Sequence, residues 1–193
     1  MEHLETYFNE VKLIADQIDK VAIENLANSL AYVKQVKGRV FILGIGGSAA
    51  NASHMVNDLR KLCGIEAYCP TDNVSEFSAR TNDDGFESVF EKYLEISNFN
   101  QYDAIFILSV GGGNKEKNVS VNLIRAIDYV KMKKGMVIGI VGKPDGYAAQ
   151  KGQCVVVPIV STDRITPHSE AFQAVVWHSL VSHPKLQVQK TKW

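Results

Sequence analysis

Apolar residues recur every three or four positions over residues 3–37, a stretch that contains neither proline nor glycine. This spacing predicts helix, because it places the apolar side chains on one face of a 3.6-residue turn. One long helix or two helices that meet near Asp19 would satisfy it. The apolar stripe is broader than one small sheet requires, so we expect part of it to pack on another subunit.

Beyond residue 38, short runs rich in β-branched residues alternate with helical patterns. The runs have the length and composition of buried strands and lie at 39–43, 65–69, 104–108, 136–141 and 154–159. Helices are predicted at 48–62, 86–96, 119–133, 147–150 and 170–182. Regular alternation of strand and helix predicts an α/β fold in which a parallel sheet carries helices on both faces.

Composition limits the class of protein. With 193 residues, the chain has room for one substantial core and too little for two ordinary domains, so we expect a single domain over 1–193 with a loose tail at 187–193. Equal numbers of basic and acidic residues, 21 of each, argue against a nucleic-acid-binding surface. No apolar run reaches the roughly 18 residues that span a bilayer, and the first residues are acidic and amphipathic, so we expect a cytoplasmic protein without membrane contact.

Two glycine-rich loops follow the first and third predicted strands, GIGGS at 44–48 and SVGGGN at 109–114. Ligands of parallel α/β folds bind at this edge of the sheet. Glycine lets the backbone approach a ligand, and free amides at a helix start favour an anion. Two such loops on different strands indicate one anionic ligand held from both sides.

The first loop also permits a different interpretation. Gly44, Gly46 and Ala49 match the dinucleotide-binding fingerprint. The acidic residue expected at the end of the second strand would be Glu66, which lies near the start of that strand. Nucleotide binding is therefore the minor alternative, and absence of thermal stabilisation by NAD would exclude it.

Two predicted helices carry paired histidine and carboxylate side chains. His54 and Asp58 are four residues apart, and Glu170 and His178 are eight apart, so each pair shares a helix face. Such pairs bind a divalent metal or act as acid and base. Taken singly, each pair is more often an ordinary surface pair than a catalytic one.

Four stretches, taken in order, resemble the sugar isomerase (SIS) domain family and, within it, the phosphoheptose isomerases. They are 44–50 followed by His54, the stretch at 82–86, the loop at 109–114, and 163–165 ahead of the helix with His178. The resemblance covers nearly the whole chain. It implies a three-layer αβα sandwich with a five-stranded parallel sheet, an N-terminal helical extension over 1–37, a core over 38–186, and a homotetramer with active sites between subunits.

The resemblance also implies a reaction, the isomerisation of sedoheptulose 7-phosphate to an aldoheptose 7-phosphate for bacterial surface polysaccharide, often with zinc. Moving a proton between adjacent carbons through an enediol requires a base, an acid and a group that polarises the carbonyl. By position, the resemblance places Zn²⁺ on His54, Asp58, Glu170 and His178, and acid–base catalysis on Asp58, Glu170 and His178. The implied substrate-binding positions are Gly46, Gly47, Ser48, Asn51, Asp83, Ser109, Gly111, Gly112, Gly113 and Asn114.

Several positions depart from the family pattern. Ile45 replaces an asparagine, and Val110 and Gly111 stand where the family has threonine and serine hydroxyls. Phosphate binding then depends on backbone amides, or on Ser109 and Lys115.

The metal-binding positions differ as well. Asp58 stands where the family has a longer glutamate, and Glu170 where it has a glutamine. Together these departures leave open an alternative from another class: a non-catalytic SIS protein that senses a phosphosugar, or a tetrameric adaptor for a partner such as a replication initiator.

Overall fold

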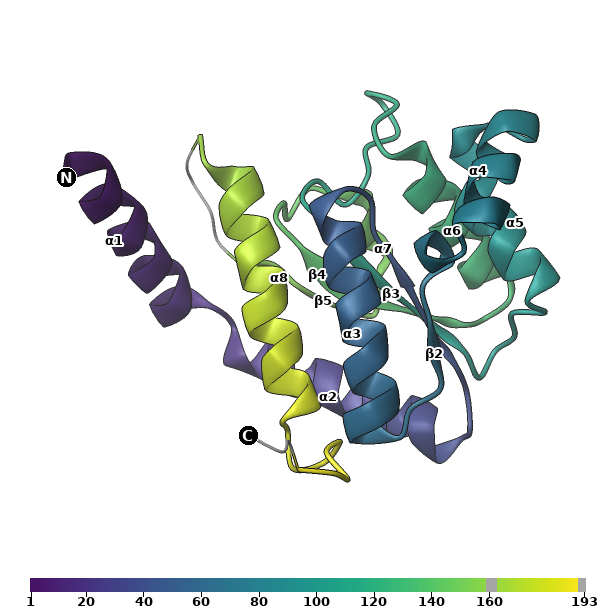
Figure 1. Ribbon diagram of the computed structural model, residues 1–193, viewed down its shortest axis with the longest axis horizontal. Helices are drawn as coiled ribbons and strands as arrows, with labels where there is room; N and C mark the ends of the chain where they lie inside the picture. The colour runs from purple at the N-terminus through teal and green to yellow at the C-terminus, as the bar shows by residue number, and fades with distance from the viewer. Residues whose placement is uncertain (159–162, 191–193) are drawn as a thin grey trace.

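The computed structural model describes residues 1–158 and 163–190. In it, five strands form one parallel sheet with the order β2-β1-β3-β4-β5 (Figure 1). Their bounds are β1 Val40–Leu43, β2 Ala67–Tyr68, β3 Ala104–Ser109, β4 Met136–Val141 and β5 Cys154–Val156. The predicted α/β fold with a five-stranded parallel sheet is confirmed.

Helices cover both faces of the sheet (Figure 1). They are α1 (Glu2–Gln17), α2 (Lys20–Gln35), α3 (Gly47–Cys63), α4 (Val74–Asp83), α5 (Val89–Ile96), α6 (Val121–Met132), α7 (Tyr147–Lys151) and α8 (Ile165–Val181), with 3₁₀ turns at Pro70–Asp72 and Phe86–Ser88. Successive strand side chains point to opposite faces. Val40 therefore joins the core under α2, α3 and α8, whereas Phe41 joins the core under α5, α6 and α7.

The N-terminal stretch forms two helices, which settles the alternative that the sequence left open. The break lies at Asp19, whose carboxylate accepts hydrogen bonds from the amides of Val21 and Ala22 at 2.9 and 3.0 Å and so caps α2. Helix α2 belongs to the core layer, because Leu26 and its neighbours on the same face are fully buried. Helix α1 leaves apolar side chains such as Phe8, which is 58% exposed, in solvent.

Helix α8 begins at Ile165, five residues before the predicted start at Glu170. Pro167 lies in the first turn of this helix. Backbone amides of the first turn have no intrahelical acceptor, so proline, which has no amide hydrogen, does not interrupt the helix there. Helix α6 begins later than predicted, at Val121, because Ser120 takes a left-handed conformation with φ of 51°.

Helix α4 was not predicted. None of its residues is fully buried and its sequence is mostly polar, so it offers few apolar positions by which a helix is recognised in sequence. Strand β5 ends at Val156, and the predicted end at Ile159 lies outside the described residues.

The C-terminal segment after α8 is partly attached to the fold. The amides of Val188 and Gln189 donate hydrogen bonds to the carbonyl oxygen of Leu62 at 2.8 and 3.1 Å. Residues 191–193 of the predicted tail lie outside the described part of the chain. Among the described helices, none is both long and apolar enough to cross a membrane.

Candidate active site

Helices α3 and α8 pack side by side on one face of the sheet (Figure 1). They bring His54 and Asp58, which form one predicted pair, next to His178 of the other pair. His54, Asp58 and His178 each offer one ligand atom, and these three atoms lie within 4.8 Å of one another. The Nε2 atom of His54 is 3.8 Å from Oδ2 of Asp58. We refer to these three residues as the α3–α8 triad.

Trp177 packs against both histidine rings of the triad. Its side chain is fully buried, stacks on the ring of His178 at a centroid distance of 3.5 Å, and meets the ring of His54 edge-on at 4.7 Å. The two imidazoles stand nearly perpendicular to each other, 5.3 Å apart. One buried indole therefore limits the positions of both histidines.

A backbone hydrogen bond orients His178. Its Nδ1 atom lies 2.8 Å from the carbonyl oxygen of Ala174. A carbonyl oxygen only accepts, so Nδ1 carries the hydrogen, and in the neutral ring Nε2 then holds the lone pair. Metal-binding histidines are held in the same way. Two imidazole nitrogens and one carboxylate oxygen are a donor set that suits Zn²⁺, so the triad fits the metal that the sequence predicted.

Glu170 is the fourth predicted metal ligand, and the structure does not bring it into the triad. Its carboxylate lies against Gly47, where an added β-carbon would be 2.5 Å from Oε2. The eight residues that separate Glu170 from His178 correspond to about 12 Å along the helix. Glu170 thus lies at the end of α8 next to the first glycine loop, and its role as a metal ligand stays a prediction.

A chain of hydrogen bonds joins the first loop to α8 through Gln173, which sequence reasoning missed. The buried Gln173 donates from Nε2 to Oγ of Ser48 at 3.0 Å and accepts from Nδ2 of Asn51 at 3.1 Å. Asn51 also donates to the carbonyl oxygen of Glu170 at 3.0 Å. The one sequence signal that could have indicated a role for Gln173 is that a polar residue stands on the apolar face of the predicted helix, three positions after Glu170.

The second glycine loop has its own internal support. Oγ of Ser109 accepts a hydrogen bond from the amide of Gly112 at 3.0 Å. Gly112 and Gly113 have φ of +69° and +87°, a region that residues with a β-carbon rarely adopt. Two other predicted residues lie at helix ends. Gly46 immediately precedes α3 with φ of +65°, and Asp83 is the exposed last residue of α4. Gly111 and Asn114 lie in the loop between β3 and α6.

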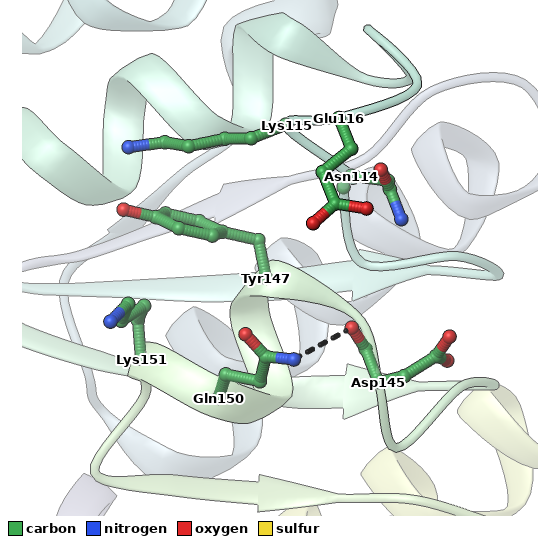
Figure 2. Close-up of a pocket in the computed structure, with 8 residues that line it drawn as sticks. Asn114, Lys115, Glu116, Asp145, Tyr147, Gln150 and Lys151 are labelled. Atoms are coloured by element: carbon green, nitrogen blue, oxygen red, sulfur yellow. Dashed lines mark hydrogen bonds between the residues drawn. The ribbon is translucent and has the colours of Figure 1, made fainter.

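The sequence suggested that Lys115 contributes to phosphate binding, but in the structure it contacts Asp128 and Tyr147. Its Nζ atom is 2.9 Å from Oδ2 of Asp128. The same atom lies 4.5 Å from the ring centre of Tyr147 (Figure 2). Hydrogen bonding with Tyr147 and with Asp128 raises the pKa of the Lys115 ammonium group. Lys115 is thus engaged on the α7 side of the loop.

Comparisons with known proteins show the family to which the chain belongs. The SIS domain model matches residues 6–142. The chain belongs to the SIS domain family. A phosphoheptose isomerase of Syntrophotalea carbinolica is 25% identical over 185 residues, which cover 91% of this chain and 88% of the relative. These similarities place the chain with the phosphoheptose isomerase group of the family.

A second relative is of another kind. The lincomycin biosynthesis protein LmbN of Streptomyces lincolnensis is 32% identical over 158 residues, which cover 76% of this chain and 56% of the relative. The chain thus spans little more than half the length of that protein.

Among solved structures, a phosphoheptose isomerase from Neisseria gonorrhoeae has a TM-score of 0.80 at 21% identity. The match covers 93% of this chain and 96% of the other chain. At this identity the match supports the fold alone.

Proposed function

We propose that this protein is a phosphosugar isomerase that converts sedoheptulose 7-phosphate to D-glycero-D-manno-heptose 7-phosphate through an enediol. The observation that carries the proposal is the α3–α8 triad, which lies on a SIS fold whose curated relatives include phosphoheptose isomerases. We further propose that the product supplies heptose for bacterial surface polysaccharide, and that the enzyme is a cytoplasmic homotetramer. The exposed apolar side chains of α1, such as Leu4 and Phe8, support assembly through that helix.

In the proposed mechanism, the metal is held near the C-terminal end of α8 by His178, and the base, Glu170, lies near the N-terminal end of the same helix. His54, Asp58 and His178 would hold Zn²⁺, which when bound polarises the carbonyl and hydroxyl oxygens of the sugar. Because Asp58 and His178 lie within this group, the free carboxylate of Glu170 is the base that we assign to the carbon-bound proton. The contacts of the Glu170 backbone with Asn51 and of its carboxylate with Gly47 fix the direction from which that base approaches.

If His178 is free of metal, its Nε2 lone pair is a second proton acceptor, since Nδ1 already donates to Ala174. Asp58 lies close enough to His54 to stabilise a charged imidazole there. Our assignment therefore keeps Asp58, Glu170 and His178 as the acid–base residues and names Glu170 as the base of the metal-loaded protein.

The test is turnover by the purified full-length chain. Sedoheptulose 7-phosphate is supplied with Zn²⁺, and formation of the aldoheptose phosphate is followed by NMR. We expect turnover, and we expect Glu170→Gln, which keeps size and hydrogen bonding but removes the base, to lose about a hundredfold or more in kcat. Turnover of another ketose phosphate with none of this one would disprove the substrate assignment.

A second candidate function is a non-catalytic phosphosugar sensor or adaptor. The observation that favours it is the second glycine loop, in which Val110 and Gly111 lack the hydroxyls of the family pattern. Such a protein would bind a phosphosugar without turnover and without stoichiometric metal. Stoichiometric zinc that is lost in His54→Ala and His178→Ala would count against it.

A further inference from the structure

Gln173 of α8 lies between two residues of α3 that the sequence placed in the substrate site. Its side chain is fully buried, donates from Nε2 to Oγ of Ser48 at 3.0 Å, and accepts at Oε1 from Nδ2 of Asn51 at 3.1 Å. Asn51 also donates from Nδ2 to the carbonyl oxygen of Glu170 at 3.0 Å. These four residues form one continuous series of hydrogen bonds, which we call the Gln173 chain.

The direction of every bond in the Gln173 chain follows from the Glu170 carbonyl. A carbonyl oxygen only accepts, so the group that Asn51 presents to Glu170 is its NH₂ group. The same NH₂ group contacts the amide of Gln173, which must present its oxygen to Asn51 and its own NH₂ group to Ser48. The reverse orientation of the Gln173 amide would set two donors against each other. One backbone carbonyl therefore fixes the orientation of two side-chain amides.

The two ends of the chain are left with opposite hydrogen-bonding character. The Ser48 hydroxyl accepts from Gln173, and among residues 1–158 and 163–190 it donates to no group, although the residue is only 2% exposed. A buried hydroxyl hydrogen without an acceptor is uncommon in a folded protein. Nδ2 of Asn51 already has two acceptors, and Oδ1 accepts from no group in the described part of the chain. Ser48 thus offers a donor, and Asn51 an acceptor, beside the first glycine loop.

We propose that Gln173 is a positioning residue, which makes the Ser48 hydroxyl a donor and Oδ1 of Asn51 an acceptor toward the sugar substrate. The inference rests on the proposed function, because it states how that site recognises its substrate. A sugar phosphate carries both partners, since its oxygen atoms accept and its hydroxyl groups donate. Gln173 is itself fully buried and acts only through its two neighbours.

Gln173→Glu tests the direction of the bonds while the shape of the side chain stays the same. An ionised carboxylate only accepts, so it keeps the bond from Asn51 but takes the hydroxyl hydrogen of Ser48 away from the substrate. A protonated carboxyl donates one hydrogen and accepts at its other oxygen, which restores the arrangement that the glutamine makes. Burial raises the pKa of a carboxyl toward neutral pH, so both forms can be assayed.

The experiment measures kcat and KM of the purified full-length protein for sedoheptulose 7-phosphate between about pH 5 and pH 8. Each value is divided by that of the wild type at the same pH, which removes the titration of Glu170 and His178 that both proteins share. For Gln173→Glu we expect a KM about tenfold above the wild type at about pH 8 and close to the wild type at about pH 5. The kcat ratio should stay within about twofold, because Asn51 keeps its bond to the Glu170 backbone.

Three further variants separate bond direction from other effects, and circular dichroism at each pH checks that they are folded. Gln173→Leu loses both bonds at every pH, so its KM ratio should be raised by a factor that does not change with pH. Gln101→Glu adds the same charge at an exposed position before β3, at the opposite end of the sheet, and should match the wild type. Ser48→Ala removes the hydroxyl, and adding Gln173→Glu to it should raise KM little further at about pH 8.

Two results would overturn the role of Gln173: a wild-type KM for Gln173→Glu at about pH 8, or a KM ratio for that variant that is constant with pH. Calorimetric titration with the same sugar phosphate separates this inference from the proposed function. Binding without turnover would reject the isomerase alone, and the pH dependence of the Kd ratio would then test Gln173 in place of KM. A wild type that neither binds nor converts this sugar phosphate would reject both.

Discussion

Gly47 makes room for the carboxylate of Glu170: a β-carbon at position 47 would lie 2.5 Å from Oε2 and 2.7 Å from Oε1. The glycine begins α3, and the carboxylate comes from the second turn of α8. In Gly47→Ala the flexible end of Glu170 must move, because the backbone on either side is held by the hydrogen bonds of Asn51. A base displaced by about 1 Å loses up to a hundredfold in rate, so we expect kcat to fall by about tenfold to a hundredfold.

The measurement is steady-state turnover with circular dichroism and thermal melting as checks on folding. Combining Gly47→Ala with Glu170→Gln provides the control. If the methyl group acts only by moving the carboxylate, the double variant has the same activity as Glu170→Gln alone. Additive losses would show that Gly47 acts through something other than Glu170.

Zinc binding should depend on each residue of the α3–α8 triad. Removing one ligand opens the site, and we expect His54→Ala, Asp58→Ala and His178→Ala to lower zinc affinity by at least about a hundredfold. The measurement is metal content by mass spectrometry after dialysis. His183→Ala, which removes a histidine that contacts Glu24 instead, is the control and should retain the metal. Full zinc content in all three triad variants would contradict the assignment.

The strands and the histidine positions were predictable because both depend on local spacing. β3 is a six-residue run that is buried throughout, and such a run predicts a central strand of a parallel sheet wherever it occurs. His54 and Asp58 share a face of any helix that contains both. Residue spacing does not show that α3 and α8 lie side by side. That contact was expected only from the family resemblance.

Other features depend on contacts that no local pattern contains. α4 packs with none of its residues fully buried, and its mostly polar sequence contains few apolar positions that would predict a helix. Gln173 is a good helix residue on an apolar face, and only the approach of Ser48 and Asn51 from α3 gives it a role. The pairing of Lys115 with Asp128 joins residues 13 apart in sequence. The sequence shows that Lys115 lies near the second glycine loop, but it does not show that this lysine forms an ion pair with Asp128.

Gln173 should contribute to stability through its two side-chain hydrogen bonds. In Gln173→Leu the volume is similar, but Oγ of Ser48 and Nδ2 of Asn51 lose a partner in the interface of α3 and α8. A buried polar group without a partner costs about 1–3 kcal/mol, so the free energy of unfolding should fall by about 2 kcal/mol. Urea unfolding measures it, with Gln17→Leu, the same change at an exposed position, as the control. An equal loss in both variants would show that the buried hydrogen bonds contribute nothing.

The contact between α1 and α8 should give the protein a stability that disappears in acid. Glu10 of α1 accepts a hydrogen bond from Nε of Arg164 at 2.9 Å and lies 2.7 Å from Nε2 of the buried His168. The hydrogen bonds from Arg164 and then from His168 lower the pKa of the Glu10 carboxyl from 4.5 to about 2. A pKa that is lower in the folded than in the unfolded chain stabilises the fold above pH 4.5, and this contribution is lost as the pH falls from 4.5 towards 2.

Thermal melting of the wild type and of Glu10→Gln across this pH range tests the contact. We expect the wild type to melt at a higher temperature at pH 6, and the difference between the two proteins to shrink steadily below pH 4.5, because protonation removes from the wild type the same charge that the substitution removes. Glu5→Gln, an exposed change on the same helix, should show no such convergence. A difference in Tm that stays constant down to pH 2 would mean that the Glu10 charge is not what holds α1 against the first turn of α8.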